Sequence, residues 1–180
     1  MKNGLNAEGI GSAFSNRTRS HIYVRSFRGT DAMMKDPSKR RAEVKFIGRI
    51  KEPGEEKAEI EIFQEFLDGL RGIDEFSHLI ILYWFHLRDN EEERRTLLVF
   101  PRRHGVNVKK GIFACRSPSR PNPIGLCVVK LIKVEGNVLT VRGLDAFMDS
   151  PIIDIKPYLP RADSVPNAHV PSWTLRGPST

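Results

Sequence analysis

Apolar and polar residues alternate in short runs from residue 44 onward, and this pattern predicts β-strands. In 44–50, Val44, Phe46 and Ile50 share one parity, and in 59–62 two isoleucines alternate with two glutamates. Such alternation is typical of strands that bury one face. The run His78–Phe85 is almost wholly apolar, as in a strand covered on both faces. We expect it to be the core strand.

Further short runs extend the predicted sheet. Two β-branched runs, 126–134 and 138–144, flank Glu135, Gly136 and Asn137, which predicts a hairpin with a three-residue loop. The runs 96–100 and 152–155 are each stopped by proline, and residues 66–76 fit a short helical turn and a loop. Six or seven short strands without long helices predict a mainly β fold, a mostly antiparallel sheet or barrel.

The length of 180 residues predicts one domain with a real core. Residues 1–40 show no periodicity and are rich in Gly, Ser, Asn and Arg, so we expect a disordered basic arm. Three interpretations of this segment are open: it binds RNA, it targets the protein to an organelle, or it is translated from an upstream start codon while the true start is Met33 or Met34. The domain is expected at 41–165, and a tail at 166–180.

Composition favours a soluble cytoplasmic protein. Hydrophobic residues make up 39% and charged residues 28%, and no apolar run approaches the length of a membrane span. The start lacks the pattern of a secretory signal. Cys115 and Cys127 are too few for a disulfide framework and are not spaced for zinc, so both are interpreted as packing residues.

Net charge alone supports nucleic-acid binding weakly. Of the total of +7, residues 1–40 hold eight Lys or Arg and three Asp or Glu, which leaves 21 basic against 19 acidic residues for 41–180. A local basic cluster precedes residue 111: Arg94, Arg95, Arg102, Arg103, His104, Lys109 and Lys110. It fits phosphate neutralisation or a solvated basic loop, tempered by the acidic residues 91–93.

The most unusual segment is Gly111–Gly125. Its three prolines remove backbone donors and stiffen the loop, so that Arg116, Ser117, Arg120 and Asn122 are presented with little ordering cost. Such side chains suit recognition of a phosphate, a carboxylate or a ribose. A structural loop whose arginines pair with acids is the alternative reading, and a PxxP ligand is a weaker one.

For the other polar residues, a structural role is as plausible an interpretation as a functional one. His78 and His86 share strand parity but lack a third ligand at a recognisable spacing, so no metal site is assigned. Asp154, Lys156 and Tyr158 share parity and form either one polar pocket or an ion pair at a barrel end. A glycine-rich dinucleotide fingerprint is missing from the domain, so no Rossmann-type methyltransferase is indicated.

In its motifs the chain resembles the TsaA-like family, also called YaeB, whose characterised members are the tRNA methyltransferases called TrmO. The resemblance covers residues 44–165 in family order. Besides Gly111–Gly125, it is carried by the following stretches: Gly69–Leu79, Tyr83–His86, Leu144-Asp145 and Pro151–Tyr158. It implies a single β-barrel domain, a homodimer with S-adenosylmethionine near the subunit interface, and methyl transfer to N6 of N6-threonylcarbamoyladenosine beside the tRNA anticodon.

The resemblance also implies a site, which it places residue by residue. It implies cofactor contacts at Pro53, His86, Leu87, Arg116, Leu126, Asp145, Ala146, Phe147 and Met148. For substrate we expect contacts at Arg120, Asn122, Lys156 and Tyr158. An N6 beside a carbonyl is a poor nucleophile until it loses its proton, and Asp154 or His86 is the expected base.

Two departures from the family pattern limit this transfer. Glu52-Pro53-Gly54 passes almost at once into the next strand, which puts the expected cofactor contact there in question. In Asp145–Pro151 the second acid is displaced by one residue to Asp149, and in a strand that shift would turn it to the other face. Alternative functions are a non-enzymatic S-adenosylmethionine- or RNA-binding regulatory module, and a methyltransferase acting on another substrate.

Overall fold

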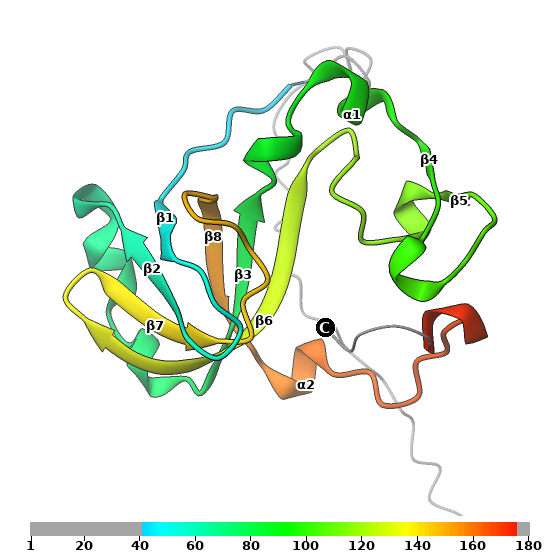
Figure 1. Cartoon of the computed structure of the whole chain (residues 1–180). Coiled ribbons are helices and arrows are strands. Elements are labelled where there is room, and N and C mark those ends of the chain that lie inside the picture. Colours follow the sequence, from blue (N-terminus) through cyan, green and yellow to red (C-terminus); the bar gives the residue numbers. More distant parts are fainter. Residues whose placement is uncertain (1–40, 176–180) are drawn as a thin grey trace, which may run out of the picture. The chain divides into compact units, whose positions relative to one another are not determined.

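Six strands close into an antiparallel barrel (Figure 1), and alternate side chains of its strands are buried inside. The computed structural model describes residues 41–175. Around the barrel the order is β1 (Gly48–Glu52), β2 (Ala58–Ile62), β7 (Val138–Arg142), β6 (Ile124–Glu135), β3 (His78–Trp84) and β8 (Pro151–Pro157). The predicted mainly β, mostly antiparallel barrel is confirmed. The predicted arm, residues 1–40, lies outside the described residues.

The interior of the barrel is aliphatic. Strand β2 shows strict alternation, with Ala58, Ile60 and Ile62 buried and the two glutamates between them partly exposed. The remaining buried core comes from all strands and one loop: Ile50, Leu79, Ile81, Tyr83, Val129, Leu139, Val141, Leu144 and Ile152. Burial of these side chains is the main source of the barrel's stability.

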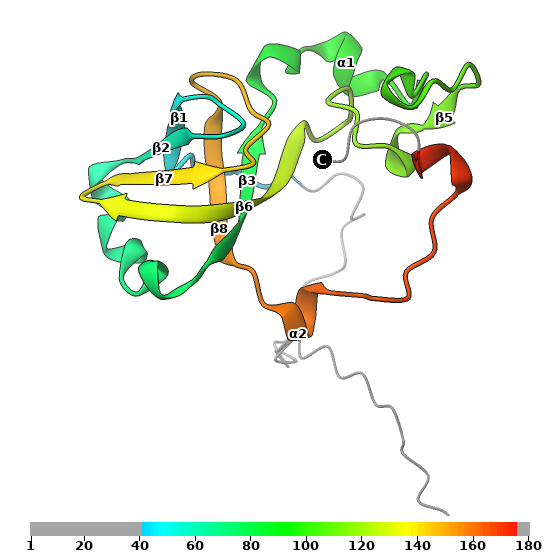
Figure 2. The same ribbon diagram turned by 60° about the horizontal axis from the view of Figure 1, so that its bottom comes forward.

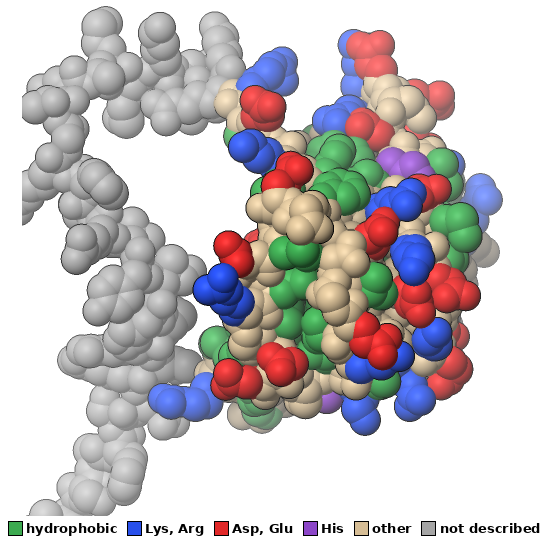
Figure 3. All heavy atoms as spheres, turned by 90° about the vertical axis from the view of Figure 1, so that its left-hand side faces the viewer, with side chains coloured by type: hydrophobic (Ala, Val, Ile, Leu, Met, Phe, Trp, Pro, Cys, Tyr) green, Lys and Arg blue, Asp and Glu red, His purple; other side chains and the backbone are tan. Residues whose placement is uncertain are grey.

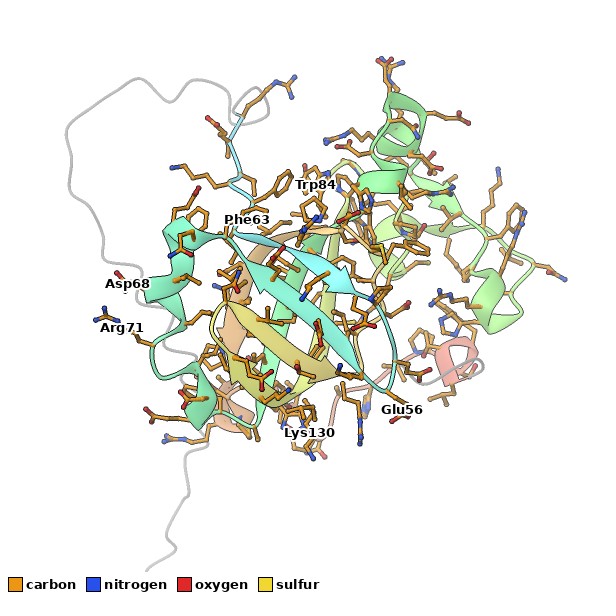
Figure 4. All side chains as sticks on the ribbon, turned by 60° about the vertical axis from the view of Figure 1, so that its left-hand side comes forward. Glu56, Phe63, Asp68, Arg71, Trp84 and Lys130 are labelled. Carbon is orange, nitrogen blue, oxygen red and sulfur yellow. The ribbon has the colours of Figure 1, made fainter. Side chains whose placement is uncertain are left out.

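Strand β3 differs from the expectation of a strand covered on both faces. Leu79, Ile81 and Tyr83 are buried, but the residues between them are only half-buried. In a closed barrel the outer face of a strand meets solvent unless another element covers it. Figure 4 shows the length of this strand pair, with Trp84 near one end and Lys130 near the other.

The hairpin of β6 and β7 is tighter than expected. Glu135 pairs with Val138, so the loop contains two residues, Gly136 and Asn137, rather than three. Gly136 has a φ of 59°, a left-handed value that glycine adopts without strain.

One junction of the barrel is short. Strands β1 and β8 share only the register pairs Gly48 with Ile152 and Arg49 with Pro151. Below this junction a 3-10 helix, Gln64–Leu70, packs against the core, followed by a second one, Ile73–Glu75, as the predicted helical turn required. Its outer side carries the ion pair of Asp68 and Arg71, which points to solvent (Figure 4).

A second sheet stands apart from the barrel (Figures 1 and 2). It pairs β4 (Leu98–Val99) with β5 (Lys110–Gly111). Helix α1 (Glu91–Arg95) precedes it, and the Asn90 side chain caps that helix. The remaining elements are short: 3-10 helices His86–Arg88, Arg102–His104, Ile112–Ala114 and Ser172–Leu175, and helix α2 (Pro160–Asp163). Within 41–175 no helix is long and apolar enough to cross a membrane.

Candidate active site

The predicted signature segment, 111–125, ends at the start of β6, where this strand pairs with β3. Gly125 pairs with Tyr83 across β6 and β3, and the Tyr83 ring lies flat over the glycine. A Cβ at position 125 would lie 2.6 Å from Cε2 of that ring. Only glycine fits here without a shift, because real Cβ atoms do not approach so closely. The last residue of the signature therefore has a packing role.

Tyr83 connects this pair to the loop between β7 and β8. Its hydroxyl donates to the Asp145 carbonyl oxygen at 2.5 Å, and its ring packs edge-on against Phe85. Burial raises the pKa of the Tyr83 hydroxyl, so it stays a neutral donor at physiological pH. The backbone of the expected cofactor loop, residues 145–148, is thus held to the barrel core by one buried hydroxyl.

Charged groups gather around Cys127 at the same end of the barrel. Burial raises the pKa of the Cys127 thiol, while the nearby Arg116 guanidinium and the Asp145 carboxylate act on it in opposite directions. Arg116 is exposed and makes no ion pair with any described residue. Asp145 pairs with Arg103 at 3.2 Å. Asp145 is thus occupied by Arg103, whereas the Arg116 cation has no ion-pair partner among the described residues and is available to an anion.

Arg120 is occupied by its own loop. Its guanidinium donates to the carbonyl oxygens of Ser117 at 2.7 Å, Cys115 at 2.7 Å and Ile112 at 3.2 Å. These three bonds replace the backbone pairing that the prolines deny to this segment. Asn122, also expected to contact substrate, is exposed, and its carbonyl oxygen accepts from Ile124.

Helix α1 holds the signature loop from outside. Arg94 donates to the Pro121 carbonyl oxygen at 3.1 Å, pairs with Asp89, and lies over the Trp84 ring at 5.4 Å. Trp84 in turn donates to Asp89 at 2.8 Å. The pKa of Asp89 is lowered, chiefly by the hydrogen bond from Arg94. Arg94, one of the cluster considered for phosphate contact, is thus engaged in a structural clamp.

His86 follows β3 directly beneath the signature loop. The preceding residue, Phe85, donates its N–H to the Pro123 carbonyl oxygen at 2.7 Å. Among the buried side-chain nitrogen and oxygen atoms of the described residues, Nδ1 of His86 is the one without a hydrogen-bond partner. Since buried polar atoms are normally paired, this nitrogen suits a bound molecule or a transferred proton. Leu87, next along the chain, is 62% exposed.

The remaining expected cofactor residues lie on two surfaces. Ala146 packs against the core, whereas Phe147 and Met148 are exposed. Pro53 is next to Gly54, which forms an isolated bridge with Leu144, so this shortened turn still borders the 145–148 loop. Leu126, by contrast, points outward from β6 and is 47% exposed.

Asp154 lies on the outer face of the barrel. Register places Leu126, Leu82 and Asp154 in one row across β6, β3 and β8. Asp154 pairs with Lys156 at 2.6 Å, as the structural reading of that trio proposed. Tyr158 packs edge-on against His78, with ring centroids 6.5 Å apart. Asp154 is therefore on the outer face of the barrel, whereas Tyr83, which bonds to Asp145, faces the interior.

A hollow of about 340 Å³ also borders Asp154. It opens beside the short junction of β1 and β8, beneath the 3-10 helix that begins at Gln64. Its walls are mostly apolar: Ile47, Ile62, Phe66, Leu70, Ile73 and Ile155. None of the expected cofactor residues lines it, so size alone does not identify the reactive site, and the charged cluster near Cys127 fits a charged ligand better.

Asp149 does not join the site. It has a φ of 59° in a turn, and its carboxylate pairs with Arg49 at 3.1 Å on the outside of the barrel. The displaced acid therefore serves an ion pair beside β1. Residues 145–149 form a turn rather than the strand assumed for the parity argument.

Two residues at this site were missed in the sequence. Tyr83 had a signal, because a tyrosine on a buried strand face needs a partner for its hydroxyl. Arg103 had none, since its contact with Asp145 joins residues 42 positions apart. Among the described residues no group of three His, Cys, Asp or Glu could hold a metal ion.

Comparison with known proteins adds a family to this geometry. Residues 48–164 match the model of the tRNA-methyltransferase O N-terminal domain. A probable S-adenosyl-L-methionine-binding protein of Methanothermobacter thermautotrophicus is 46% identical over 133 residues, which cover 74% of this chain and 90% of that protein. The tRNA (adenine(37)-N6)-methyltransferase of Escherichia coli is 45% identical over 105 residues, 56% of this chain but 44% of that enzyme.

A solved structure shares the fold. TrmO from Pseudomonas aeruginosa superposes with a TM-score of 0.57 at 27% identity, covering 72% of this chain and 61% of the other. The chain thus spans most of the archaeal relative and less than two thirds of the bacterial proteins.

Proposed function

We propose, since this chain belongs to the tRNA-methyltransferase O N-terminal domain family, that it transfers a methyl group from S-adenosylmethionine to N6 of an adenosine in tRNA. Two kinds of relative support the proposal. Those from archaea are named S-adenosyl-L-methionine-binding proteins, and that from Escherichia coli is named for N6 methylation of adenine 37. The carrying observation is the buried Tyr83, which pairs with the last glycine of the signature loop and whose hydroxyl holds the Asp145 carbonyl oxygen.

The residues at this end of the barrel fit the proposed cofactor. Its carboxylate requires a cation, and Arg116 offers one without an ion pair inside residues 41–175. Its ribose and amino groups require acceptors and donors, which the Asp145 carboxylate and the unpartnered His86 Nδ1 can supply. Exposed Phe147 and Met148 offer apolar walls. When bound, the cofactor supplies an electrophilic methyl group on a sulfonium.

The work left to the protein is positioning and proton removal. Methyl transfer needs an in-line approach, so a stiff loop that holds Arg116 in place lowers the entropic part of the barrier. The loop is stiffened by Arg120 and by the α1 clamp. His86 is the favoured base within one protomer, because it adjoins the signature loop and has a free buried nitrogen.

Asp154 remains the second candidate base. Asp154 lies in one register row with Leu126 on the outer face of the barrel. In a dimer that places the cofactor of a second protomer against this row, the Asp154 carboxylate would lie next to the transferred methyl group. Lys156 and Tyr158 follow on the same strand and its continuation, and we assign them, with Asn122, to contacts with the RNA. An Asp154→Asn variant is expected to cut turnover with little loss of cofactor affinity if this arrangement holds.

The finer substrate in the proposal is N6-threonylcarbamoyladenosine next to the anticodon. Its N6 lies beside a carbonyl, which lowers the pKa of the N6 proton and makes a positioned base effective. We further propose a homodimer, because Leu126 and Val128 leave an apolar outer face on β6, each with 47% of its surface exposed. A cytoplasmic location is part of the proposal, in keeping with a tRNA substrate.

The test combines labelled S-adenosylmethionine, bulk tRNA and nucleoside mass spectrometry. Methylated N6-threonylcarbamoyladenosine is expected, and a different methylated nucleoside would replace the substrate assignment. Arg116→Ala should weaken cofactor binding about 10- to 100-fold in calorimetry, since a charge-assisted hydrogen bond contributes about 1.5–3 kcal/mol. Lys133→Ala, on the far hairpin, is the matched control and should bind normally. Equal affinities of both variants would remove Arg116 from the site.

A regulatory binding module is the second candidate. The chain covers 90% of an archaeal relative named only for binding S-adenosylmethionine, and less than half of the bacterial enzyme. Binding of the cofactor without transfer to any tRNA nucleoside would favour this function over the enzyme.

A further inference from the structure

Positive charge is concentrated in one stretch of the domain. Residues 94–134 contain ten Lys or Arg and no Asp or Glu, whereas residues 41–93 contain seven Lys or Arg and fourteen Asp or Glu. The small net charge of the whole domain therefore hides a strongly basic segment. The side of the barrel in Figure 3 is different, since acidic and basic side chains lie next to one another there. Strands β1 and β2 and the turn between them likewise carry paired charges, Arg49 with Glu61 and Lys57 with Glu59.

Ion pairing divides the basic segment. Both arginines of α1 pair with acids, and Arg103 pairs with Asp145. Arg102, Lys109 and Lys110 make no ion pair with any residue of 41–175. These three cations belong to the connection and second strand of the β4–β5 hairpin, and they are half of the six cations of 94–134 that make no ion pair inside 41–175, the others being Arg116, Arg120 and Lys130.

The segment after the family domain folds back onto this hairpin. The 3-10 helix Ser172–Leu175 packs against the 3-10 turn Arg102–His104 in the connection of this hairpin. The Trp173 ring is half-buried, and its centroid lies 5.5 Å from the centroid of the His104 ring. The Lys110 Nζ lies 5.8 Å from the centroid of the Trp173 ring. Lys109 likewise lies over the Phe100 ring at 5.6 Å, and that ring is 44% exposed. Two aromatic rings, Phe100 within the hairpin and Trp173 beside it, thus each lie next to a lysine of the hairpin.

The hairpin is linked directly to the candidate active site. Arg103 and His104 are neighbours on one 3-10 turn. Arg103 reaches Asp145 at the barrel end, while His104 touches Trp173. A molecule bound at Trp173 is therefore held by the same turn that contacts the cofactor loop.

We infer that Trp173, with Phe100, Lys109 and Lys110, forms a platform that stacks an unpaired base of the RNA and neutralises its adjoining phosphates. Aromatic faces interleaved with unpaired cations are the usual means of holding single-stranded nucleic acid. An acidic protein would satisfy the lysines but has no need of the rings. The inference rests on the proposed function only for the identity of the RNA as tRNA.

The test measures RNA affinity of the full chain by fluorescence anisotropy. The probes are a labelled tRNA anticodon stem-loop and labelled oligouridylate. Trp173→Ala should weaken binding about 5- to 100-fold, and Trp173→Phe should recover most of the loss, because stacking on an aromatic side chain has that magnitude. Leu175→Ala, in the same short helix and 74% exposed, is the matched control and should bind as the parent does.

A second variant keeps both aromatic rings and tests the phosphate contacts separately. Replacing Lys109 and Lys110 together by alanine should reduce the slope of log affinity against log salt by about 1.4, as expected for two phosphate contacts on a single strand. Lys133→Ala, which removes a lysine paired with Glu135 on another hairpin, should leave the slope unchanged.

The outcomes separate this inference from the proposed function. Normal RNA binding by both Trp173→Ala and the double lysine variant would overturn the platform, even if methyl transfer to tRNA is intact. Loss of RNA binding in these variants would support it, even if no methyl transfer is found. In a competition experiment, polyglutamate is added at the same concentration of charges as the RNA. If it displaces the RNA equally well from the parent protein and from Trp173→Ala, the surface binds an acidic protein and the inference is overturned.

Discussion

Gly125 and Tyr83 illustrate how one residue pair serves both packing and the candidate site. The ring of Tyr83 occupies the space where a side chain at position 125 would lie. The same tyrosine then reaches the Asp145 carbonyl oxygen. The last glycine of the signature is thus required so that a hydroxyl can hold the cofactor loop.

Replacing Gly125 by alanine should destabilise the protein by about 1–3 kcal/mol, the usual cost of overpacking. Gly111→Ala is the matched control, because a Cβ there meets no atom within 4 Å. Thermal unfolding of both variants measures the difference. Equal midpoints would mean that the Tyr83 ring moves aside without cost.

Removing the Tyr83 hydroxyl with Tyr83→Phe should lower S-adenosylmethionine affinity about 5- to 10-fold. The hydrogen bond to the cofactor loop contributes about 1 kcal/mol, and the loop then samples conformations that do not bind. Calorimetry with the cofactor measures the change, and circular dichroism verifies the fold. Unchanged affinity would show that other contacts hold residues 145–148.

At the level of elements, helix α1 and the signature loop form one unit. Arg94 joins Asp89, Trp84 and the Pro121 carbonyl oxygen, and Arg120 ties three carbonyl oxygens within the loop. Two arginines in a basic segment thus serve structure. They order the loop that carries Arg116.

The clamp should show a pH dependence that identifies it. The pKa of Asp89 is lower in the folded chain than in the unfolded one, so its ion pair stabilises the fold above the ordinary pKa of about 4 and loses this effect as pH falls through the folded value. Asp89→Asn should therefore cost about 0.5–1 kcal/mol at neutral pH, with the difference shrinking below about pH 4. Urea unfolding at several pH values tests this, and a constant difference would contradict it.

Sequence pattern predicted the strands and the barrel class, but not the exact register or the long-range side-chain contacts. Alternation around Ile60 and the β-branched runs of the hairpin were sufficient to predict strands, since each strand buries every second side chain. The loop length was wrong by one residue, because register is set by cross-strand pairing. The contact of Arg103 with Asp145 depends on the path of the whole chain, which periodicity does not contain.

On the scale of the whole molecule, the apolar outer face of β3 and β6 is the main surface without a described partner. Val128→Asp should convert the proposed homodimer to a monomer and weaken cofactor binding, because a charge at an apolar interface is costly to bury. Light scattering with calorimetry measures both. Lys133→Asp, on the same strand near the hairpin, is the control and should remain dimeric. A monomeric parent protein would refute the dimer directly.

The two register pairs between β1 and β8 also determine how this barrel moves. Backbone bonds of Ile47 to Ile152 and of Ile50 to Ser150 and Asp149 extend this junction, but it is still the shortest of the barrel, so we expect the barrel to open there first. The amide protons of Gly48 and Ile50 should therefore exchange with deuterium through local opening, well before those of β3, which is paired along its whole length on β6 and along most of it on β8.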